Sequence, residues 1–129
     1  MTILDKLYDR WNDHDIEGVL AYFRDDLVYT DKTINTTFRG RDELAQFMAG
    51  SFVSIPDLRF ELLHTIETDT DCAGEALMIG TFEKDLGPIK ATGKAFTIKY
   101  GIVGRIVDGK VFELNDYWNF AEFLGDDQQ

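Results

Sequence analysis

The chain has 129 residues, of which 44% are hydrophobic and 13% aromatic, a composition typical of one globular domain that needs no disulfide or metal. Thirteen basic residues against 24 acidic ones give a net charge of −11, which makes nucleic acids and anionic membrane surfaces poor partners. No apolar run reaches the length of a membrane span, no signal peptide is visible, and the single cysteine fits a reducing compartment, so we expect a cytoplasmic protein.

The first half of the chain has helical periodicity. Asp15 is placed to cap one helix, and Pro56 forces an end to another before it. We expect helices over 2–12, 16–23 and about 42–52, with a short strand over 27–31.

From Leu58 onward the apolar period changes to two, which predicts strands. We expect strands over 58–67, 73–84, 95–107 and 110–119, with a loop over 85–94. Asp108-Gly109, between two apolar runs, predicts a tight hairpin. Helices followed by strands indicate an α+β fold.

One acidic residue falls on an apolar strand face. Alternation places Asp116 in a wall made of its own strand and the preceding one, whose other members are Phe96, Ile98, Tyr100, Ile102, Phe112, Leu114 and Trp118. An apolar wall raises the pKa of a carboxyl, which makes Asp116 a candidate acid or base near neutral pH. The alternative is that Asp116 lies near the end of the sheet and forms a cap or an ion pair.

The order of these segments resembles the nuclear transport factor 2-like superfamily and, within it, the SnoaL-like polyketide cyclases (ester cyclases). The resemblance covers nearly the whole chain and rests on WNDHDIEGVLAYFRDD, LVYTD, FRGRDELAQF, ATGK, and RIVDGK followed by Asp116. It implies a single SnoaL-like domain over 1–129. The implied α+β fold is cone-shaped, with three N-terminal helices packed on a curved antiparallel or mixed sheet that encloses a pocket.

The resemblance also implies a chemistry. In such cyclases the aspartate at the place of Asp116 is a general acid/base that removes a proton alpha to a carbonyl, and ring closure follows by intramolecular aldol attack without metal or cofactor. This chain has Ile102 where the cyclases have a histidine. The chain also resembles ketosteroid isomerases, whose base falls on Asp31, although their oxyanion tyrosine falls on Leu7. Asp31 equally fits a strand-end residue that bonds its own backbone.

The catalytic candidates are therefore Asp116 and Asp31. Trp11 and Tyr29 join the apolar wall as candidate substrate-binding residues, although both could simply be core residues. No cluster of histidine, cysteine and acidic residues has metal-ligand spacing, so no metal site is expected.

The two histidines are expected to be structural. His14 lies between two predicted helices as a loop or cap residue, and His64 shares the predicted buried face of its strand.

Three functions remain open from the sequence. The first is a cofactor-free cyclase or isomerase acting on a hydrophobic carbonyl compound. The second is a binding module for a hydrophobic small molecule without chemistry. The third is a structural homodimer, because the resemblance implies pairing through the outer face of the sheet, where Val103 and Tyr117 lie in this chain.

Overall fold

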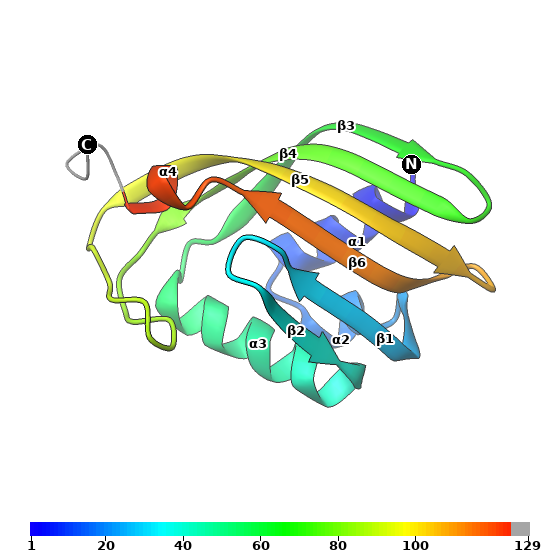
Figure 1. Ribbon diagram of the computed structural model, residues 1–129, viewed down its shortest axis with the longest axis horizontal. Coiled ribbons are helices and arrows are strands. Elements are labelled where there is room, and N and C mark those ends of the chain that lie inside the picture. The colour runs from blue at the N-terminus through cyan, green and yellow to red at the C-terminus, as the bar shows by residue number, and fades with distance from the viewer. Residues whose placement is uncertain (125–129) are drawn as a thin grey trace.

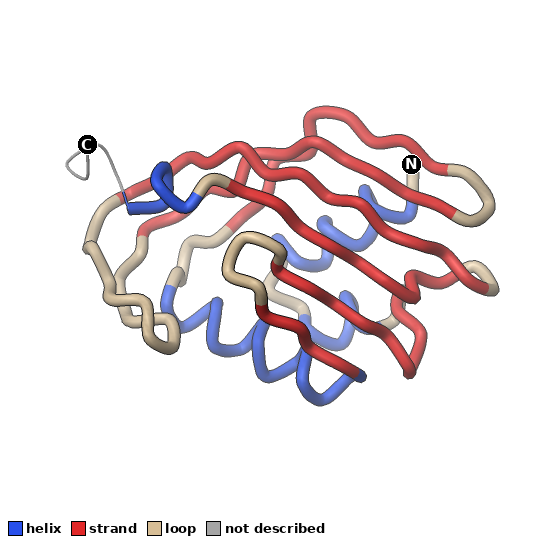
Figure 2. Tube along the Cα trace, viewed as in Figure 1, coloured by secondary structure: helices blue, strands red, loops and turns tan. Residues whose placement is uncertain are grey.

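The computed structural model describes residues 1–124, so the last five residues of the expected domain lie outside the described part. The described residues form one curved sheet with strand order β2-β1-β6-β5-β4-β3, and helices α1, α2 and α3 lie together on one of its faces (Figures 1 and 2). Every pair of neighbouring strands is antiparallel except β1 and β6, which are parallel. The expected α+β architecture with a mixed sheet is confirmed. In chain order the elements are α1 (Ile3–Asn12), α2 (Ile16–Leu20), β1 (Phe23–Asp31), β2 (Thr36–Arg39), α3 (Gly40–Ser54), β3 (Arg59–Glu67), β4 (Asp71–Thr81), β5 (Ala95–Val107), β6 (Lys110–Trp118) and α4 (Phe120–Leu124). None of the described helices is long and apolar enough to cross a membrane.

Helix α1 begins with a capping box. The Thr2 hydroxyl accepts a hydrogen bond from the Asp5 backbone N–H at 3.3 Å, and the Asp5 carboxylate accepts one from the Thr2 backbone N–H at 2.9 Å. These bonds satisfy backbone donors that the first helical turn leaves free. The buried stripe of the helix, which faces the sheet, consists of Leu4, Leu7, Tyr8 and Trp11.

The segment after α1 differs from the prediction. Asp15 caps α2 by accepting from the Gly18 N–H at 2.9 Å, but the helix ends at Leu20 and the strand begins at Phe23, four residues earlier than expected. Phe23 pairs with Val111 of β6, so pairing within the sheet overrides the helical spacing of the local sequence.

Strand β2 was not expected. It exists because the chain turns back directly after β1, where Oδ1 of Asp31 accepts hydrogen bonds from the N–H groups of Thr33 and Ile34 at 3.0 and 3.2 Å. Helix α3 follows at Gly40, whose φ of 81° lies in the region that glycine tolerates best.

A β-bulge in β3 changes which of its side chains face inward, compared with the prediction from alternation. The pairing of β3 with β4 shifts between Leu62 and His64, so the residues beyond the shift point to the opposite side from the one predicted. His64 and Ile66 are therefore exposed on the outer face, and Ile66 is 57% exposed. The expectation that His64 lies on the buried face of its strand is wrong.

The hairpin of β5 and β6 is confirmed, with positive φ angles of 53° at Asp108 and 77° at Gly109. A second register shift, between Arg105 and Ile106, reverses the faces to which the side chains at the start of β6 point. Phe112 consequently turns away from the core and lies under the Arg24 guanidinium, which is 5.9 Å from the ring centroid. The predicted alternation holds for the rest of the strand, where Leu114 and Asp116 are buried.

Candidate active site

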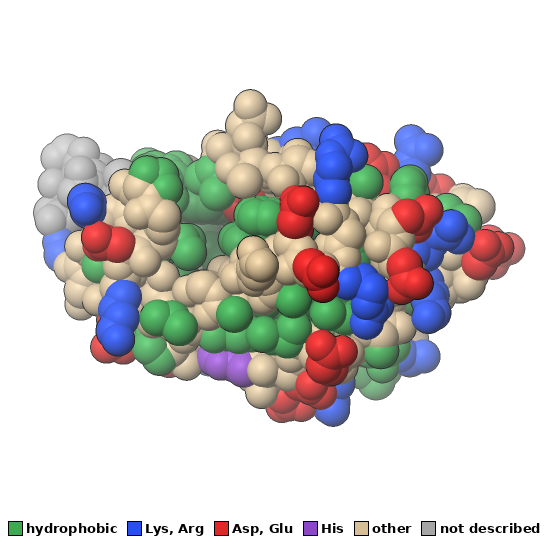
Figure 3. All heavy atoms as spheres, turned by 90° about the horizontal axis from the view of Figure 1, so that it is seen from below, with side chains coloured by type: hydrophobic (Ala, Val, Ile, Leu, Met, Phe, Trp, Pro, Cys, Tyr) green, Lys and Arg blue, Asp and Glu red, His purple; other side chains and the backbone are tan. Residues whose placement is uncertain are grey.

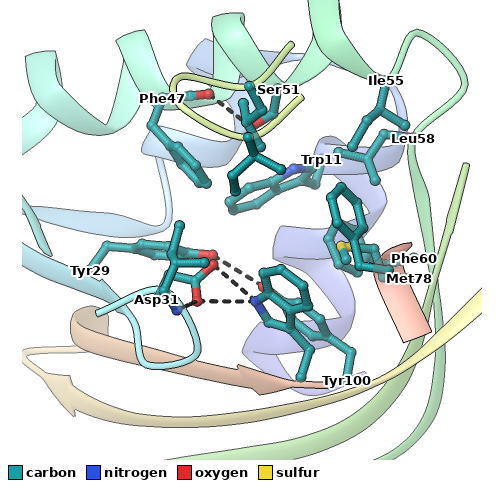
Figure 4. A pocket seen from close by; sticks show the side chains of 15 residues that line it. Trp11, Tyr29, Asp31, Phe47, Ser51, Ile55, Leu58, Phe60, Met78 and Tyr100 are labelled. Carbon is teal, nitrogen blue, oxygen red and sulfur yellow. Dashed lines mark hydrogen bonds between the residues drawn. The ribbon is translucent and has the colours of Figure 1, made fainter. Parts of the chain in front are cut away.

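A cavity of about 50 Å³ lies between the helices and the concave face of the sheet. From below, hydrophobic side chains surround a hollow in the molecular surface (Figure 3). Side chains from α1, α3, the sheet, the 82–94 loop and α4 enclose the cavity (Figure 4). Its lining consists of Trp11, Tyr29, Asp31, Ile34, Phe47, Ser51, Ile55, Leu58, Phe60, Met78, Leu86, Ile89, Tyr100, Trp118 and Phe123.

Asp116 lies behind the wall of this cavity. Its side chain is 1% exposed, and Oδ2 accepts hydrogen bonds from the hydroxyls of Tyr29 and Tyr100, which lie 3.2 Å from each other. Oδ1 is buried and has no hydrogen-bond partner among the described residues. The two tyrosines line the cavity and Asp116 does not, so the hydroxyls stand between the carboxyl and any ligand.

The environment of Asp116 favours its protonated form. The pKa of this carboxyl is raised from 3.8 to about 7, because burial and then the charge of Asp31 raise it by more than the two tyrosine hydrogen bonds lower it. Burial and the charge of Asp116 also raise the pKa of Tyr29 and Tyr100 well above 10, so both phenols remain neutral donors. Asp116 therefore exchanges its proton close to neutral pH.

Asp31 is the carboxyl that faces the cavity. It is 5% exposed, and both of its oxygens accept from the indole N–H of Trp118 at 3.0 Å (Figure 4). Burial raises its pKa, whereas the indole and two backbone N–H groups lower it. Among the described residues, its Oδ2 receives only the shared indole N–H, so it retains lone pairs for a ligand.

The two carboxyls are neighbours because β1 and β6 pair in parallel. Asp31 and Asp116 are Cα partners in that pairing and both are buried. Two such acids do not ionise together readily, so the pair releases its protons in two steps. The N–H donors on Asp31 stabilise its charge, which makes Asp31 the first to ionise and leaves the remaining proton on Asp116.

The structure brings together part of the predicted site. Trp11, Tyr29, Asp31, Tyr100 and Trp118 all line the cavity. Other members of the predicted wall are buried in the core outside this lining, and these are Phe96, Ile98, Ile102 and Leu114. Phe112 lies outside the wall altogether. Ile102 is the Cα partner of Asp116 and supplies no titratable group there.

Neither histidine lines the cavity. His14 adopts a positive φ of 55° in the loop between α1 and α2, as expected for a loop residue. Its ring stacks on Phe52 with 4.0 Å between centroids, and Nε2 lies 2.9 Å from the Leu58 carbonyl oxygen.

Sequence reasoning missed the wall that α3 contributes. Phe47, Ser51 and Ile55 are spaced four residues apart, which places them on one stripe of a helix, and this signal was available in the sequence. Leu86 and Ile89 come from an irregular loop, where no periodic signal marks them.

Within the described residues, no group of three or more histidine, cysteine or acidic side chains could hold a metal ion. Cys72 is buried, and burial together with the nearby charges of Glu67 and Asp71 raises its pKa to about 11, so the thiol stays protonated and is a poor nucleophile.

Comparisons with known proteins agree with this architecture. A family model for the SnoaL-like domain matches residues 4–114. A protein from Jannaschia sp. CCS1, provisionally named a SnoaL-like polyketide cyclase, superposes with a TM-score of 0.83 at 12% identity over 96% of this chain and 90% of its own.

Two further structures show the same fold. An NTF2-like protein of unknown function from Burkholderia pseudomallei K96243 has a TM-score of 0.80 at 21% identity over 95% of this chain and 92% of its own. A protein with a ketosteroid isomerase-like fold from Catenulispora acidiphila DSM 44928, in complex with trimethylamine, has a TM-score of 0.80 at 18% identity over 93% and 87%. No curated protein sequence matches the chain significantly. The resemblance read from the sequence is therefore confirmed for family and fold.

Proposed function

Because this chain belongs to the SnoaL-like domain family, we propose that it is a cofactor-independent enzyme that transfers a proton on a hydrophobic carbonyl compound in a cyclase- or isomerase-type reaction. The observation that carries the proposal is the pair of buried carboxyls, Asp31 and Asp116, on adjacent strands beside an apolar cavity. Their environments favour opposite protonation states near neutral pH, which is the arrangement that acid–base catalysis requires.

Asp31 is the proposed base. It faces the cavity, and its ionised form is held in place by the Trp118 indole and two backbone N–H groups. It takes a proton from the carbon next to a substrate carbonyl, and the electron pair of the broken C–H bond moves into the enolate. Trp118 positions Asp31, since its N–H spans both carboxylate oxygens.

Asp116 is the proposed acid, acting through tyrosine. When protonated, it passes its proton to the hydroxyl of Tyr29 or Tyr100, which gives its own proton to the substrate. In a cyclisation the enolate carbon bonds to a second carbonyl carbon, and the new alkoxide receives this proton. In an isomerisation the proton goes to another carbon of the enolate.

The cavity limits the size of the substrate. Its volume of about 50 Å³ accommodates about three to five water molecules, or a ligand of about 100–150 Å³. A monocyclic ketone matches this volume, whereas a steroid or a fused-ring polyketide exceeds it. We therefore propose a small carbonyl substrate.

Two small probes test the proposal and separate the two chemistries. Cyclohex-3-enone reports isomerisation to the conjugated enone by ultraviolet absorbance. Heptane-2,6-dione reports aldol cyclisation to 3-hydroxy-3-methylcyclohexanone, which is measured by chromatography together with 3-methylcyclohex-2-enone, the product of its loss of water. We expect Asp31→Asn to lower kcat/KM about 10²- to 10⁴-fold for the accepted probe. Asp9→Asn, an exposed position on α1, serves as the matched control. Wild-type turnover no faster than that of Asp31→Asn with both probes would overturn the proposal.

A binding protein without chemistry is the second candidate. Ile102, the Cα partner of Asp116, occupies the place where the cyclases that this chain resembles have a histidine. If the protein only binds, both probes should raise its melting temperature without forming any product.

A further inference from the structure

Aromatic rings surround the candidate cavity from several sides. They come from α1, β1, α3, β3 and β5, and the residues labelled in Figure 4 are Trp11, Tyr29, Phe47, Phe60 and Tyr100. The face of an aromatic ring carries a partial negative charge, so rings attract an organic cation as well as excluding water. This wall therefore suits a ligand that is both apolar and positively charged.

The formal charge on the cavity wall is negative. Among the residues that line the cavity, Asp31 is the acid, and lysine, arginine and histidine are absent from the described lining. Its carboxylate accepts from the backbone N–H groups of Thr33 and Ile34 and from the Trp118 indole, and these donors favour the ionised form. The chain as a whole carries a net charge of −11, which adds to the attraction for a cation.

Asp31 has no basic partner in the part of the chain that the structure describes. It takes part in none of the ion pairs found there, and the members of those pairs are all at least partly exposed. A buried carboxylate is costly unless its charge is compensated, and the neighbouring Asp116 is a second acid. A full positive charge is thus what this side of the cavity lacks.

The size and polarity of the cavity define the cation. A metal ion is unsuited, because no group of metal-ligating side chains exists among residues 1–124. The volume of about 50 Å³ matches an organic ligand of about 100–150 Å³. Most of the lining is apolar, so alkyl groups on the nitrogen are better accommodated than further N–H groups.

We propose that the cavity binds a small tertiary alkylammonium ion, with Asp31 as its counter-ion and the aromatic wall around its alkyl groups. This ligand class is additional to the carbonyl compound proposed above and does not rest on the proposed reaction. Both ligands use one cavity and the ionised Asp31, so the amine should compete with the carbonyl substrate.

Isothermal titration calorimetry with two matched probes tests the inference. N-Methylpiperidine is protonated at neutral pH, and 4-methyltetrahydropyran is a neutral ether with the same methyl-substituted six-membered ring. At about 5 Å and an effective dielectric constant of about 20, the attraction between two unit charges corresponds to about 10²-fold in Kd, part of which is offset by dehydration of the ammonium. We expect the wild-type protein to bind the amine at least about 10-fold more tightly than the ether in physiological salt.

Substitutions assign the two contributions. Asp31→Asn removes the charge at constant size, so the Kd for the amine should rise about 10- to 100-fold while the Kd for the ether stays unchanged. Asp9→Asn, at an exposed acid on α1, is the matched control and should leave both values unchanged. Phe47→Leu removes one ring and keeps an apolar side chain, so the amine should bind about 2- to 5-fold more weakly. If Asp31→Asn does not fold, Phe47→Leu and the wild-type comparison still decide.

The inference is overturned if the wild-type protein binds both probes equally or binds no amine at about 10 mM. It is also overturned if Asp9→Asn weakens amine binding as much as Asp31→Asn does, because the attraction would then come from the overall charge. Selective amine binding without turnover of either enzymatic probe removes the proposed reaction and leaves this inference standing. Turnover that depends on Asp31, without any preference for the amine, does the reverse.

Discussion

Replacing Asp116 by asparagine removes a titrating group and preserves the planar shape of its side chain. The amide oxygen can still accept from Tyr29 and Tyr100, so the tyrosine cluster keeps its acceptor. The amide NH₂ then occupies the place of the unpartnered Oδ1 and adds an unpaired donor, which lowers stability by a roughly constant amount at every pH. The dependence of stability on pH, rather than its absolute level, therefore isolates the ionisation of Asp116.

The magnitude follows from the raised pKa. A carboxyl whose pKa moves from 3.8 in the unfolded chain to about 7 in the folded one binds its proton about 4 kcal/mol more tightly when folded. Between these two values the folded state holds a proton that the unfolded state has lost. Stability from Asp116 is thus fully present below about pH 4 and falls by about 1.4 kcal/mol per pH unit until it is lost near pH 7.

Urea unfolding from pH 4.5 to 8 measures this effect as a difference between wild type and Asp116→Asn. We expect the free energy of unfolding of the variant, relative to wild type, to increase by about 3 kcal/mol across this range. Asp9→Asn, an exposed position on α1, controls for the loss of one charge and should run parallel to wild type. A pH-independent difference between Asp116→Asn and wild type would refute the reasoning, because it would mean that the carboxyl ionises equally in both states.

The remaining predictions concern the carboxyl pair, the sheet and the outer face. Asp31→Asn should lower the pKa of Asp116, because the Asp31 charge raises it, and a carboxyl-carbon NMR titration that gave the same pKa would show that the two acids do not interact. Gly104→Ala should lower the urea midpoint of unfolding, with a cost of about 1–3 kcal/mol, because the added Cβ would lie 2.7 Å from a β6 carbonyl oxygen. Gly50→Ala is the control, because a Cβ added there has nothing within 4 Å. Equal midpoints for the two variants would be inconsistent with this packing. Val103 is 52% exposed on the outer face of the sheet. We expect the wild-type protein to sediment as a homodimer and Val103→Lys to sediment as a monomer. A monomeric wild type would count against pairing through this face.

Local sequence patterns were sufficient to identify the acid on the apolar face. Strict alternation places Leu114, Asp116 and Trp118 on one side of the last strand, and all three point inward in the structure. The Asp108-Gly109 turn fixed the hairpin and so the neighbouring strand. Alternation and turn chemistry are local rules, and they hold wherever the strand is regular.

The same rules failed wherever a strand gained a residue. The shift after Leu62 moved His64 to the outer surface, and the shift beyond Arg105 turned Phe112 away from the core. A bulge depends on how two strands twist against each other, and a single strand's sequence does not reveal it.

Tertiary pairing supplied what the sequence could not. Asp31 and Asp116 are 85 positions apart, and only the parallel pairing of β1 with β6 makes them neighbours. The alternatives of a strand-end Asp31 and a base Asp31 prove compatible, since its Oδ1 bonds the turn while its Oδ2 remains available to the cavity. The position of Asp116 behind Tyr29 and Tyr100 likewise depends on three strands together.

The central claim is that two neighbouring buried carboxyls hold opposite protonation states near neutral pH. A carboxyl-carbon NMR titration of the wild-type protein, with Asp31→Asn and Asp116→Asn used for assignment, measures this most directly. The account predicts an Asp116 carboxyl that titrates at about 7, and an Asp31 carboxyl that ionises first, with a pKa above 3.8. Titration of Asp116 near 3.8 would contradict it, because no proton would then remain on the cluster for delivery to a substrate.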